Sequence, residues 1–172
     1  MHRIPPPPSP PAPPASRAVR DDDAAALIAL VGAAFEEHPG CVLDLAGIDA
    51  DLAAPATSAS ASGTAWWVLP GSDGLDATVG CGPVVAGVAE LKRLYVAAHA
   101  RRRGLASALV ATVEAYAADV GATQVELWTD TRFTDAHALY GRLGYRPTGE
   151  DRDLHDPSAT TEWRFVRDLP RG

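Results

Sequence analysis

The chain has 172 residues, of which 47% are hydrophobic and 22% charged, and these proportions are typical of one globular domain. Its formal net charge of −7 argues against nucleic acid as the main partner, because phosphate binding needs a basic surface. The two cysteines, Cys41 and Cys81, form no CxxC or Cys/His pattern, so neither a structural zinc site nor a disulfide framework is indicated. No apolar run could span a membrane or serve as a secretory signal, so we expect a cytoplasmic protein without a membrane partner.

The N-terminal segment differs in composition from the rest of the chain. Its first 16 residues hold eight of the 15 prolines. Such a segment favours extended polyproline II geometry and cannot bury a core. We expect residues 1–16 to be a disordered extension and residues 17–172 to form one domain. A ligand for a proline-binding partner domain is the alternative for this segment.

The first part of the domain is predicted to hold a short strand near Arg17 and two helices. Acidic residues at 21–23 precede a helix expected over 24–37, whose apolar residues recur with helical spacing. A second, weaker helix is expected over 44–54. Residues 56–63 are all small, and we expect them to form a loop.

The rest of the domain is predicted to be richer in strands. The expected strands cover 65–69, 77–85, 88–96, 124–128 and 161–166, and the expected helices cover 104–120 and 135–143. Pro83 suggests an edge position or a bulge within its strand. The strand, helix and strand over 88–128 form a crossover unit, whose two strands should be parallel. We therefore expect an α+β domain with a mixed central sheet flanked by helices.

The sharpest local signal follows the strand over 88–96, in the segment AAHARRRGLA over 97–106. A helix that starts at Gly104 leaves backbone N–H groups free, and together with the helix dipole they attract an anion. Arg101, Arg102 and Arg103 add positive charge to a chain that is otherwise acidic. These features predict a diphosphate site, and a solvated basic turn is the alternative. The P-loop and dinucleotide fingerprints are both absent.

Two motifs in this half of the chain resemble those of the GNAT acetyltransferases. Residues 101–106 (RRRGLA) resemble the [Q/R]-x-x-G-x-[G/A] pyrophosphate loop of that family, and the strand before them is similar to its fourth strand. Residues 136–145 (AHALYGRLGY) are similar to its A-x-x-L-Y-x-x-L-G-[F/Y] helix. The two motifs occur in the expected order, and the resemblance covers about residues 17–168. One departure is Phe133, which stands where many members of the family have asparagine.

This resemblance implies a GNAT-like sheet in which two parallel strands splay apart and admit the pantetheine arm of acetyl-CoA. Backbone groups of Leu94 and Val96 would hold the pantetheine and the acetyl carbonyl, and the amides of 102–106 would hold the pyrophosphate. Acetyl-CoA is thus the expected co-substrate, and no metal is expected. The cofactor-binding residues that the resemblance implies are Leu94, Tyr95, Val96, Arg101, Arg102, Arg103, Gly104, Leu105 and Ala106.

The resemblance also implies a direct attack of an amine on the thioester. Tyr140 matches the family tyrosine that protonates the departing thiolate, and packing in the core is the alternative role for its ring. Glu90 is the first candidate for the base, and a surface carboxylate is the alternative. It would share a strand face with Lys92 and Leu94 unless a bulge intervenes. Weaker candidates for the base are Glu126, Glu162, His99 and His137.

The function that the resemblance implies is an N-acetyltransferase acting on a primary amine, in a small cationic molecule or a peptide, within a ternary complex. Carboxylates in the segments that select substrates favour a cationic acceptor, although solvated helix faces give the same pattern. Trp66, Trp67 and Trp163 could line the acceptor cleft, but we expect at least two of them in the core. A non-catalytic acyl-CoA sensor or partner-binding module is the alternative function, and transfer of a longer acyl chain is a third. Many GNAT enzymes are dimers, so a homodimer is a further expectation, but no residues mark an interface.

Overall fold

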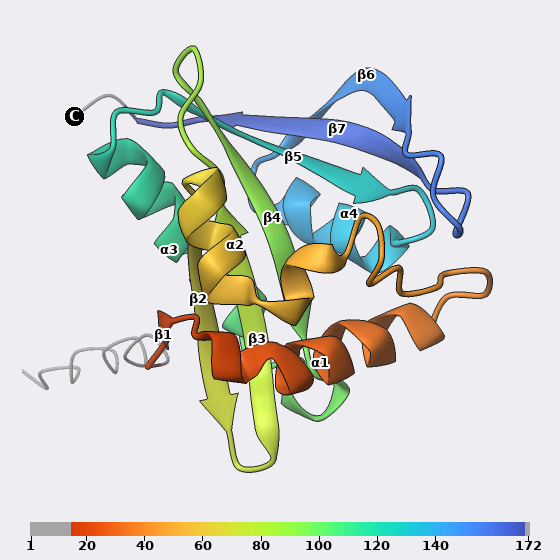
Figure 1. The fold of residues 1–172 in the computed structure, drawn as a ribbon. Coiled ribbons are helices and arrows are strands. Elements are labelled where there is room, and N and C mark those ends of the chain that lie inside the picture. The colour runs from red at the N-terminus through yellow and green to blue at the C-terminus, as the bar shows by residue number, and fades with distance from the viewer. Residues whose placement is uncertain (1–14, 171–172) are drawn as a thin grey trace, which may run out of the picture.

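The computed structural model describes residues 15–170, and a mixed sheet of seven strands runs through this part of the chain (Figure 1). Residues 1–14, on which most of the expected disordered extension falls, lie outside the described residues. The strand order is β1-β2-β3-β4-β5-β7-β6. The strands are β1 Arg17–Ala18, β2 Ala65–Gly71, β3 Gly74–Cys81, β4 Val88–Val96, β5 Gln124–Asp130, β6 Arg146–Asp153 and β7 Thr161–Asp168.

Helices cover both faces of this sheet. Helices α1 and α2 lie on one face, and α3 and α4 lie on the other (Figure 1). None of the helices in the described part of the chain is long and apolar enough to cross a membrane. The α-helices are α1 Ala24–Glu36, α2 Pro55–Ser62, α3 Leu105–Asp119 and α4 Thr134–Arg142, and the short 3-10 helices are η1 Asp21–Asp23, η2 Ala50–Ala53 and η3 Ala98–Ala100.

Each covered face has its own hydrophobic core. On one face, Leu109 and Val113 of α3 pack with buried side chains of β3, β4 and β5. On the other face, Leu27 and Val31 of α1 pack with buried side chains of β2 and β3. The α+β class and the mixed, helix-flanked sheet that we expected from the sequence are thereby confirmed.

The parallel strands β4 and β5 pair over only part of their length. Val88 to Leu91 pair in parallel with Gln124 to Leu127, and the pairing stops there. Both strands continue, β4 to Val96 and β5 to Asp130, without a ladder between them. The expected splayed parallel pair is therefore present, and its gap leaves backbone groups of both strands without a strand partner.

A β-bulge lies in the part of β4 beside this gap. The register of β3 and β4 shifts between Thr78 and Gly80, so that one residue of β3 faces two of β4. One of the two is Arg93, which has a φ of 54°. Because of the bulge, Lys92 and Arg93 both lie on the α1 and α2 face, whereas Leu94 packs against the core on the other face.

Four expectations for the chain's elements were wrong. The helix expected over 44–54 is reduced to η2, and the residues before it form a turn in which the N–H groups of Gly47 and Asp49 both donate to the Asp44 carbonyl. The loop expected over 56–63 is instead the helix α2. Pro55 stands at its start, where a missing N–H costs nothing, and Gly63 ends it with a φ of 69°.

The other two errors concern strands. No strand was expected over 146–153, where β6 lies, because this edge strand is polar throughout and shows no alternation of hydrophobic residues. The strand expected over 77–85 ends at Cys81, so that Pro83 lies beyond it. Pro83 therefore interrupts no ladder.

Candidate active site

Two cavities meet where β4 and β5 diverge. The large cavity, of about 380 Å³, is lined by β4, β5, β7 and the segment between α1 and α2. The small cavity, of about 230 Å³, is lined by the end of α1, the end of β4, Arg101 and α4. A molecule in one cavity can therefore reach a molecule in the other. The residues shared by both linings are Leu94, Tyr95, Phe133, Ala136 and Tyr140.

The loop between β4 and α3 offers a row of free backbone donors. Among the described residues, no acceptor receives a hydrogen bond from the N–H groups of residues 102–107. Arg102 and Gly104 both have a positive φ, of 60° and 72°, which turns successive N–H groups toward one side. A Cβ built on Gly104 meets no atom within 4 Å, so the space in front of this row is open. The arrangement suits a phosphate or diphosphate at the start of α3.

The edge of β4 offers further backbone groups beside the small cavity. On the side of β4 that faces β3, the Ala97 N–H donates to the carbonyl of Asp76 in β3 at 2.8 Å. Because successive residues of a strand point their N–H and C=O groups to alternate sides, those of Leu94 and Val96 face the gap toward β5. The Val96 carbonyl there accepts a hydrogen bond from Arg101 Nε at 3.1 Å. The side chain of Tyr95 itself lies on the α1 face, edge-on to Phe35.

Arg101 also forms an ion pair across the mouth of the small cavity. Its guanidinium donates to both carboxylate oxygens of Glu37, at 2.6 and 2.8 Å. This contact holds the pKa of Glu37 below its usual value. The Arg101 side chain thus joins the end of α1 to the loop after β4. Arg102 and Arg103 are exposed on the same loop.

Tyr140 lies where the two cavities meet. It is 6% exposed and packs near Tyr145 and Phe165. Burial raises the pKa of Tyr140 above its usual value, so the phenol keeps its proton. Its hydroxyl has no hydrogen-bond partner among the described residues. Since every fully buried polar side-chain atom in this part of the chain does have a partner, the Tyr140 hydroxyl cannot be fully buried. The hydroxyl therefore opens onto the cavities and can donate to a bound molecule.

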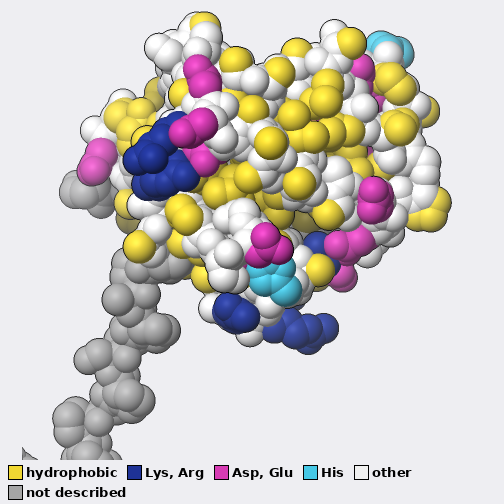
Figure 2. Space-filling view, turned by 60° about the horizontal axis from the view of Figure 1, so that its bottom comes forward, with side chains coloured by type: hydrophobic (Ala, Val, Ile, Leu, Met, Phe, Trp, Pro, Cys, Tyr) yellow, Lys and Arg dark blue, Asp and Glu magenta, His cyan; other side chains and the backbone are white. Residues whose placement is uncertain are grey.

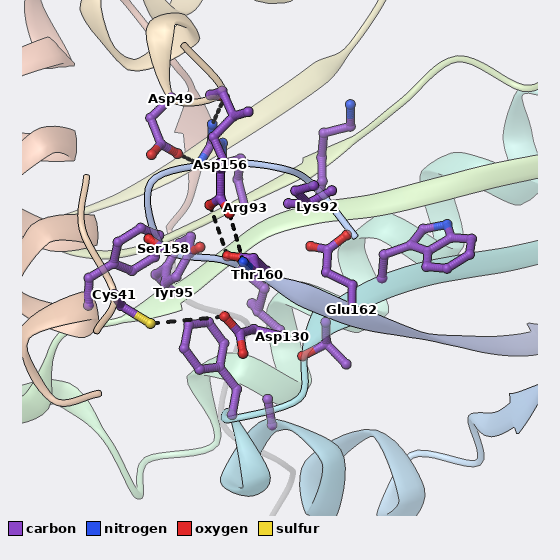
Figure 3. Close-up of a pocket in the computed structure, with 18 of the residues that line it drawn as sticks. Cys41, Asp49, Lys92, Arg93, Tyr95, Asp130, Asp156, Ser158, Thr160 and Glu162 are labelled. Atoms are coloured by element: carbon purple, nitrogen blue, oxygen red, sulfur yellow. Dashed lines mark hydrogen bonds and ion pairs between the residues drawn. The ribbon is translucent and has the colours of Figure 1, made fainter. Parts of the chain in front are cut away.

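Two glutamates line the large cavity (Figure 3). Glu162 of β7 is 15% exposed in its side chain and accepts a hydrogen bond from Arg152 at 2.7 Å. Burial raises the pKa of Glu162, repulsion from Glu90 and Asp130 adds to the rise, and Arg152 opposes it. Glu90 of β4 forms no ion pair with any described residue. Both carboxylates can receive a proton from a molecule in the cavity.

Glu90 shares a strand face with Lys92 but not with Leu94. Glu90 lies on the face of Lys92, because the Cβ that Gly82 lacks would meet both side chains at 3.6 Å. Leu94 lies on the opposite face, because the β-bulge that the sequence analysis named as a possible exception lies between Lys92 and Leu94. Glu90 and Lys92 therefore share one face of β4, with no ion pair between them in the described part of the chain.

The other candidates for the base do not line the large cavity. Glu126 pairs with Arg164 at 2.6 Å. His99 is exposed and lies 2.8 Å from Asp76. His137 Nε2 donates to the Asp130 carbonyl at 3.0 Å, and that nitrogen must carry hydrogen because a carbonyl only accepts.

The structure adds residues to the large cavity that the sequence did not indicate. The Arg152 guanidinium stacks over Trp128 at 4.3 Å, and together they form one wall. Arg93 holds Asp49 and Asp51 on another wall. No sequence pattern predicts these contacts, since each joins segments that are far apart in the chain.

The tryptophans follow the expectation that at least two belong to the core. Trp66 is buried and donates its indole N–H to the Thr78 hydroxyl at 2.7 Å. Trp67 packs edge-on against Tyr116 of α3, with ring centres 5.3 Å apart. Trp163 is 46% exposed and lies outside the lining of the large cavity.

Basic side chains on the surface occur in small groups. On the face shown in Figure 2, lysine and arginine side chains form small separate groups among acidic and hydrophobic ones. Nucleic acid binding needs a continuous basic stripe or patch. This face has none.

Comparison with known proteins identifies the family. The Acetyltransferase (GNAT) family model matches residues 49–145, which is more than half of the chain. This chain belongs to the GNAT acetyltransferase family. The matched range contains both motifs, with the pyrophosphate-loop motif between β4 and α3 and the second motif on α4.

A curated relative of this GNAT chain is the N-acetyltransferase 8 of Homo sapiens, which is 36% identical over 96 residues. The match covers 53% of this chain and 42% of the human protein. A similar protein is N-acetyltransferase 8B of Rattus norvegicus, 35% identical over 60% of this chain and 46% of its own length. The chain thus spans less than half the length of the curated relatives it matches.

Solved GNAT structures share the whole fold. An acetyltransferase of the GNAT family from Staphylococcus aureus Mu50 has a TM-score of 0.75 at 17% identity, over 90% of this chain and 98% of that one. The PaiA N-acetyltransferase from Thermoplasma acidophilum, solved in complex with coenzyme A, has a TM-score of 0.68 at 15% identity, over 90% and 98% of the two chains. At these identities the likeness establishes the fold alone.

Proposed function

We propose that this chain transfers an acetyl group from acetyl-CoA to a primary amine. The observation that carries the proposal is the position of the Tyr140 hydroxyl, which is unpaired among the described residues at the junction of the two cavities. One cavity leads toward the free N–H groups of 102–107, and the other is lined by carboxylates. An acetyl donor that carries a diphosphate would therefore occupy the small cavity, and an acceptor that carries an amine would occupy the large one.

The free N–H groups of the loop and of β4 fit acetyl-CoA. Those of residues 102–107 would bind its pyrophosphate, with positive charge from Arg101, Arg102 and Arg103 nearby. The backbone groups of Leu94 and Val96 would bind the pantetheine arm. Acetyl-CoA supplies a thioester, whose carbonyl carbon is open to a nucleophile. A backbone N–H at Val96 would stabilise the negative charge that develops on the carbonyl oxygen.

The protein's side chains would move two protons. The acceptor enters as an ammonium ion and loses one proton to a carboxylate of the large cavity, Glu90 or Glu162, directly or through a water. The neutral nitrogen then forms a bond to the carbonyl carbon, the carbon–sulfur bond breaks, and the nitrogen releases its second proton to water as the amide forms. Tyr140 donates its proton to the leaving thiolate, and a phenol held in its protonated form suits that role.

Thiol release from acetyl-CoA tests the proposal, with polyamines, aminoglycosides, amino acids and peptides as acceptors. We expect one class of amine to drive thiol release. Binding of acetyl-CoA is measured in parallel by calorimetry. Binding without release for any amine would favour the non-catalytic sensor. An absence of binding would contradict the role of the loop over 101–106.

A further inference from the structure

A third cavity adjoins the large one along β4. This side cavity, of about 240 Å³, lies among α2, β2, β3 and β4. It shares Asp51, Lys92 and Arg93 with the lining of the large cavity. A bound molecule can therefore extend from the junction at Tyr140, past Lys92, to the side cavity.

The charge of the lining changes sign along this path. Beyond the three shared residues, the lining of the large cavity has a single guanidinium, that of Arg152, against five carboxylates: Asp49, Glu90, Asp130, Asp156 and Glu162. The side cavity adds no carboxylate to the shared Asp51. Its other polar side chains include the hydroxyls of Ser58, Ser62 and Thr64.

Lys92 is the cation at the boundary, and it is the one lysine of the chain. Its stem lies over two glycines of the neighbouring strand, since a Cβ at Gly80 would meet Lys92 Cγ at 3.3 Å and one at Gly82 would meet Lys92 Cε at 3.6 Å. In Figure 3 its ammonium points away from Glu162. It forms no hydrogen bond or ion pair with any described residue.

Two carboxylates on the same wall, those of Asp49 and Asp51, are already neutralised. Asp51 accepts two hydrogen bonds from Arg93, and Asp49 accepts a third at 2.8 Å. The bulge in β4 makes this possible, because it places Arg93 on the same face as Lys92. Arg93 thus neutralises these two carboxylates. Lys92 shares its strand face with Glu90 but forms no ion pair with it among the described residues, so its ammonium can bind a ligand.

We propose that the acceptor carries an anionic group, a carboxylate in the first instance, which Lys92 binds while the acceptor's amine lies near Tyr140. The proposal rests on the proposed acetyl transfer. Lys92 and Tyr140 both line the large cavity, but Lys92 also lines the side cavity and Tyr140 the small one, so the two lie toward opposite ends of the path. The carboxylate and the amine are therefore several bonds apart, as in an ω-amino acid or a short peptide and unlike the two groups of an α-amino acid.

Two acceptors of equal length test this proposal: 6-aminohexanoate, and 6-aminohexanamide, which lacks the negative charge. We expect kcat/KM for thiol release to be at least about tenfold higher with the carboxylate, because a hydrogen bond to a charged partner is stronger than one to a neutral group. Lys92→Met should abolish the preference, and Lys92→Arg should keep most of it. Arg142→Met, which removes an exposed positive charge from α4, is the matched control and should keep the preference in full. An equal preference in wild type and Lys92→Met would overturn the proposal.

A second measurement does not need turnover. Because the chain has one lysine, protein labelled with lysine that carries ¹³C at Cε alone gives a single side-chain carbon signal in NMR, that of Lys92. With coenzyme A present, 6-aminohexanoate should shift this signal and 6-aminohexanamide should not. A shift without acetyl transfer would support the anion site and count against the proposed function. The same response to both compounds, or none to either, would overturn the anion site whatever the activity.

Discussion

At the scale of single residues, Tyr140 combines a buried ring with a hydroxyl that has no partner in the described part of the chain. Tyr140→Phe removes the hydroxyl and leaves the packing of the ring unchanged. We expect kcat for thiol release to fall by about 100-fold or more, as is usual when a general acid is lost. The melting temperature should stay the same, because the hydroxyl contributes no hydrogen bond within the protein. Full activity in this variant would show that another group protonates the thiolate.

Glu162 leads to a prediction about pH. A base must be ionised to accept a proton, and burial raises the pKa of Glu162. We expect kcat/KM to rise with pH through this raised pKa, above the usual glutamate value of about 4.3. Glu162→Gln should remove this acid limb from the pH profile. If the acid limb of the pH profile persists in Glu162→Gln and disappears in Glu90→Gln, Glu90 is the base instead.

The same raised pKa affects stability. Between the usual pKa and the raised one, the folded protein holds a proton at Glu162 that the unfolded chain has lost, so this carboxyl makes stability fall as pH rises. Its contribution is complete below the unfolded pKa and is gone above the folded pKa. Glu162→Gln cannot titrate and should lack this decline. Urea unfolding of both proteins across this pH range measures the difference.

At the scale of elements, the bulge in β4 fixes the segment between α1 and α2 on the sheet. Arg93 pairs with Asp49, which is 2% exposed. Arg93→Met leaves a buried carboxylate without its cation, and we expect the free energy of unfolding to fall by about 3 kcal/mol. The backbone cost at the positive φ is similar for both side chains, so the loss reports the ion pair. Adding Asp49→Asn should restore part of the stability in chemical denaturation, and no restoration would contradict this account.

The start and the end of helix α3 offer a matched pair of glycines. Gly104 and Gly121 have φ values of 72° and 93°, and a Cβ at either meets no atom within 4 Å. Alanine at each position should cost about 1 kcal/mol of stability. Gly104→Ala should also weaken coenzyme A binding by calorimetry, because Gly104 lies within the loop whose N–H groups are free, whereas Gly121 lies at the other end of the helix. Equal affinities in the two variants would argue against a phosphate at this end of α3.

At the scale of the whole molecule, the sequence predicted those features that depend on neighbours along the chain. Periodic apolar residues indicated α1, α3 and the central strands, and two motifs indicated the loop over 101–106 and Tyr140. Helix α2 and strand β6 escaped prediction because neither has a hydrophobic pattern. The walls of the large cavity escaped too. Arg93 meets Asp49 through a bulge, and Arg152 meets Trp128 across two strands, and both contacts depend on registers that only the folded sheet sets.

The divergence of β4 and β5 also predicts where a ligand changes the dynamics of the molecule. Beyond Leu91 the facing edges of these strands have no ladder between them, and the amides of 102–107 have no acceptor among the described residues. Such amides exchange readily with solvent, whereas those of the paired strands are protected. Coenzyme A should therefore slow exchange at Leu94, Val96 and 102–107, and leave the β2–β3 ladder almost unchanged. Hydrogen exchange with and without coenzyme A measures this pattern. Protection spread evenly over the sheet would mean that binding stabilises the domain as a whole, and the gap would then have no special part in holding the cofactor.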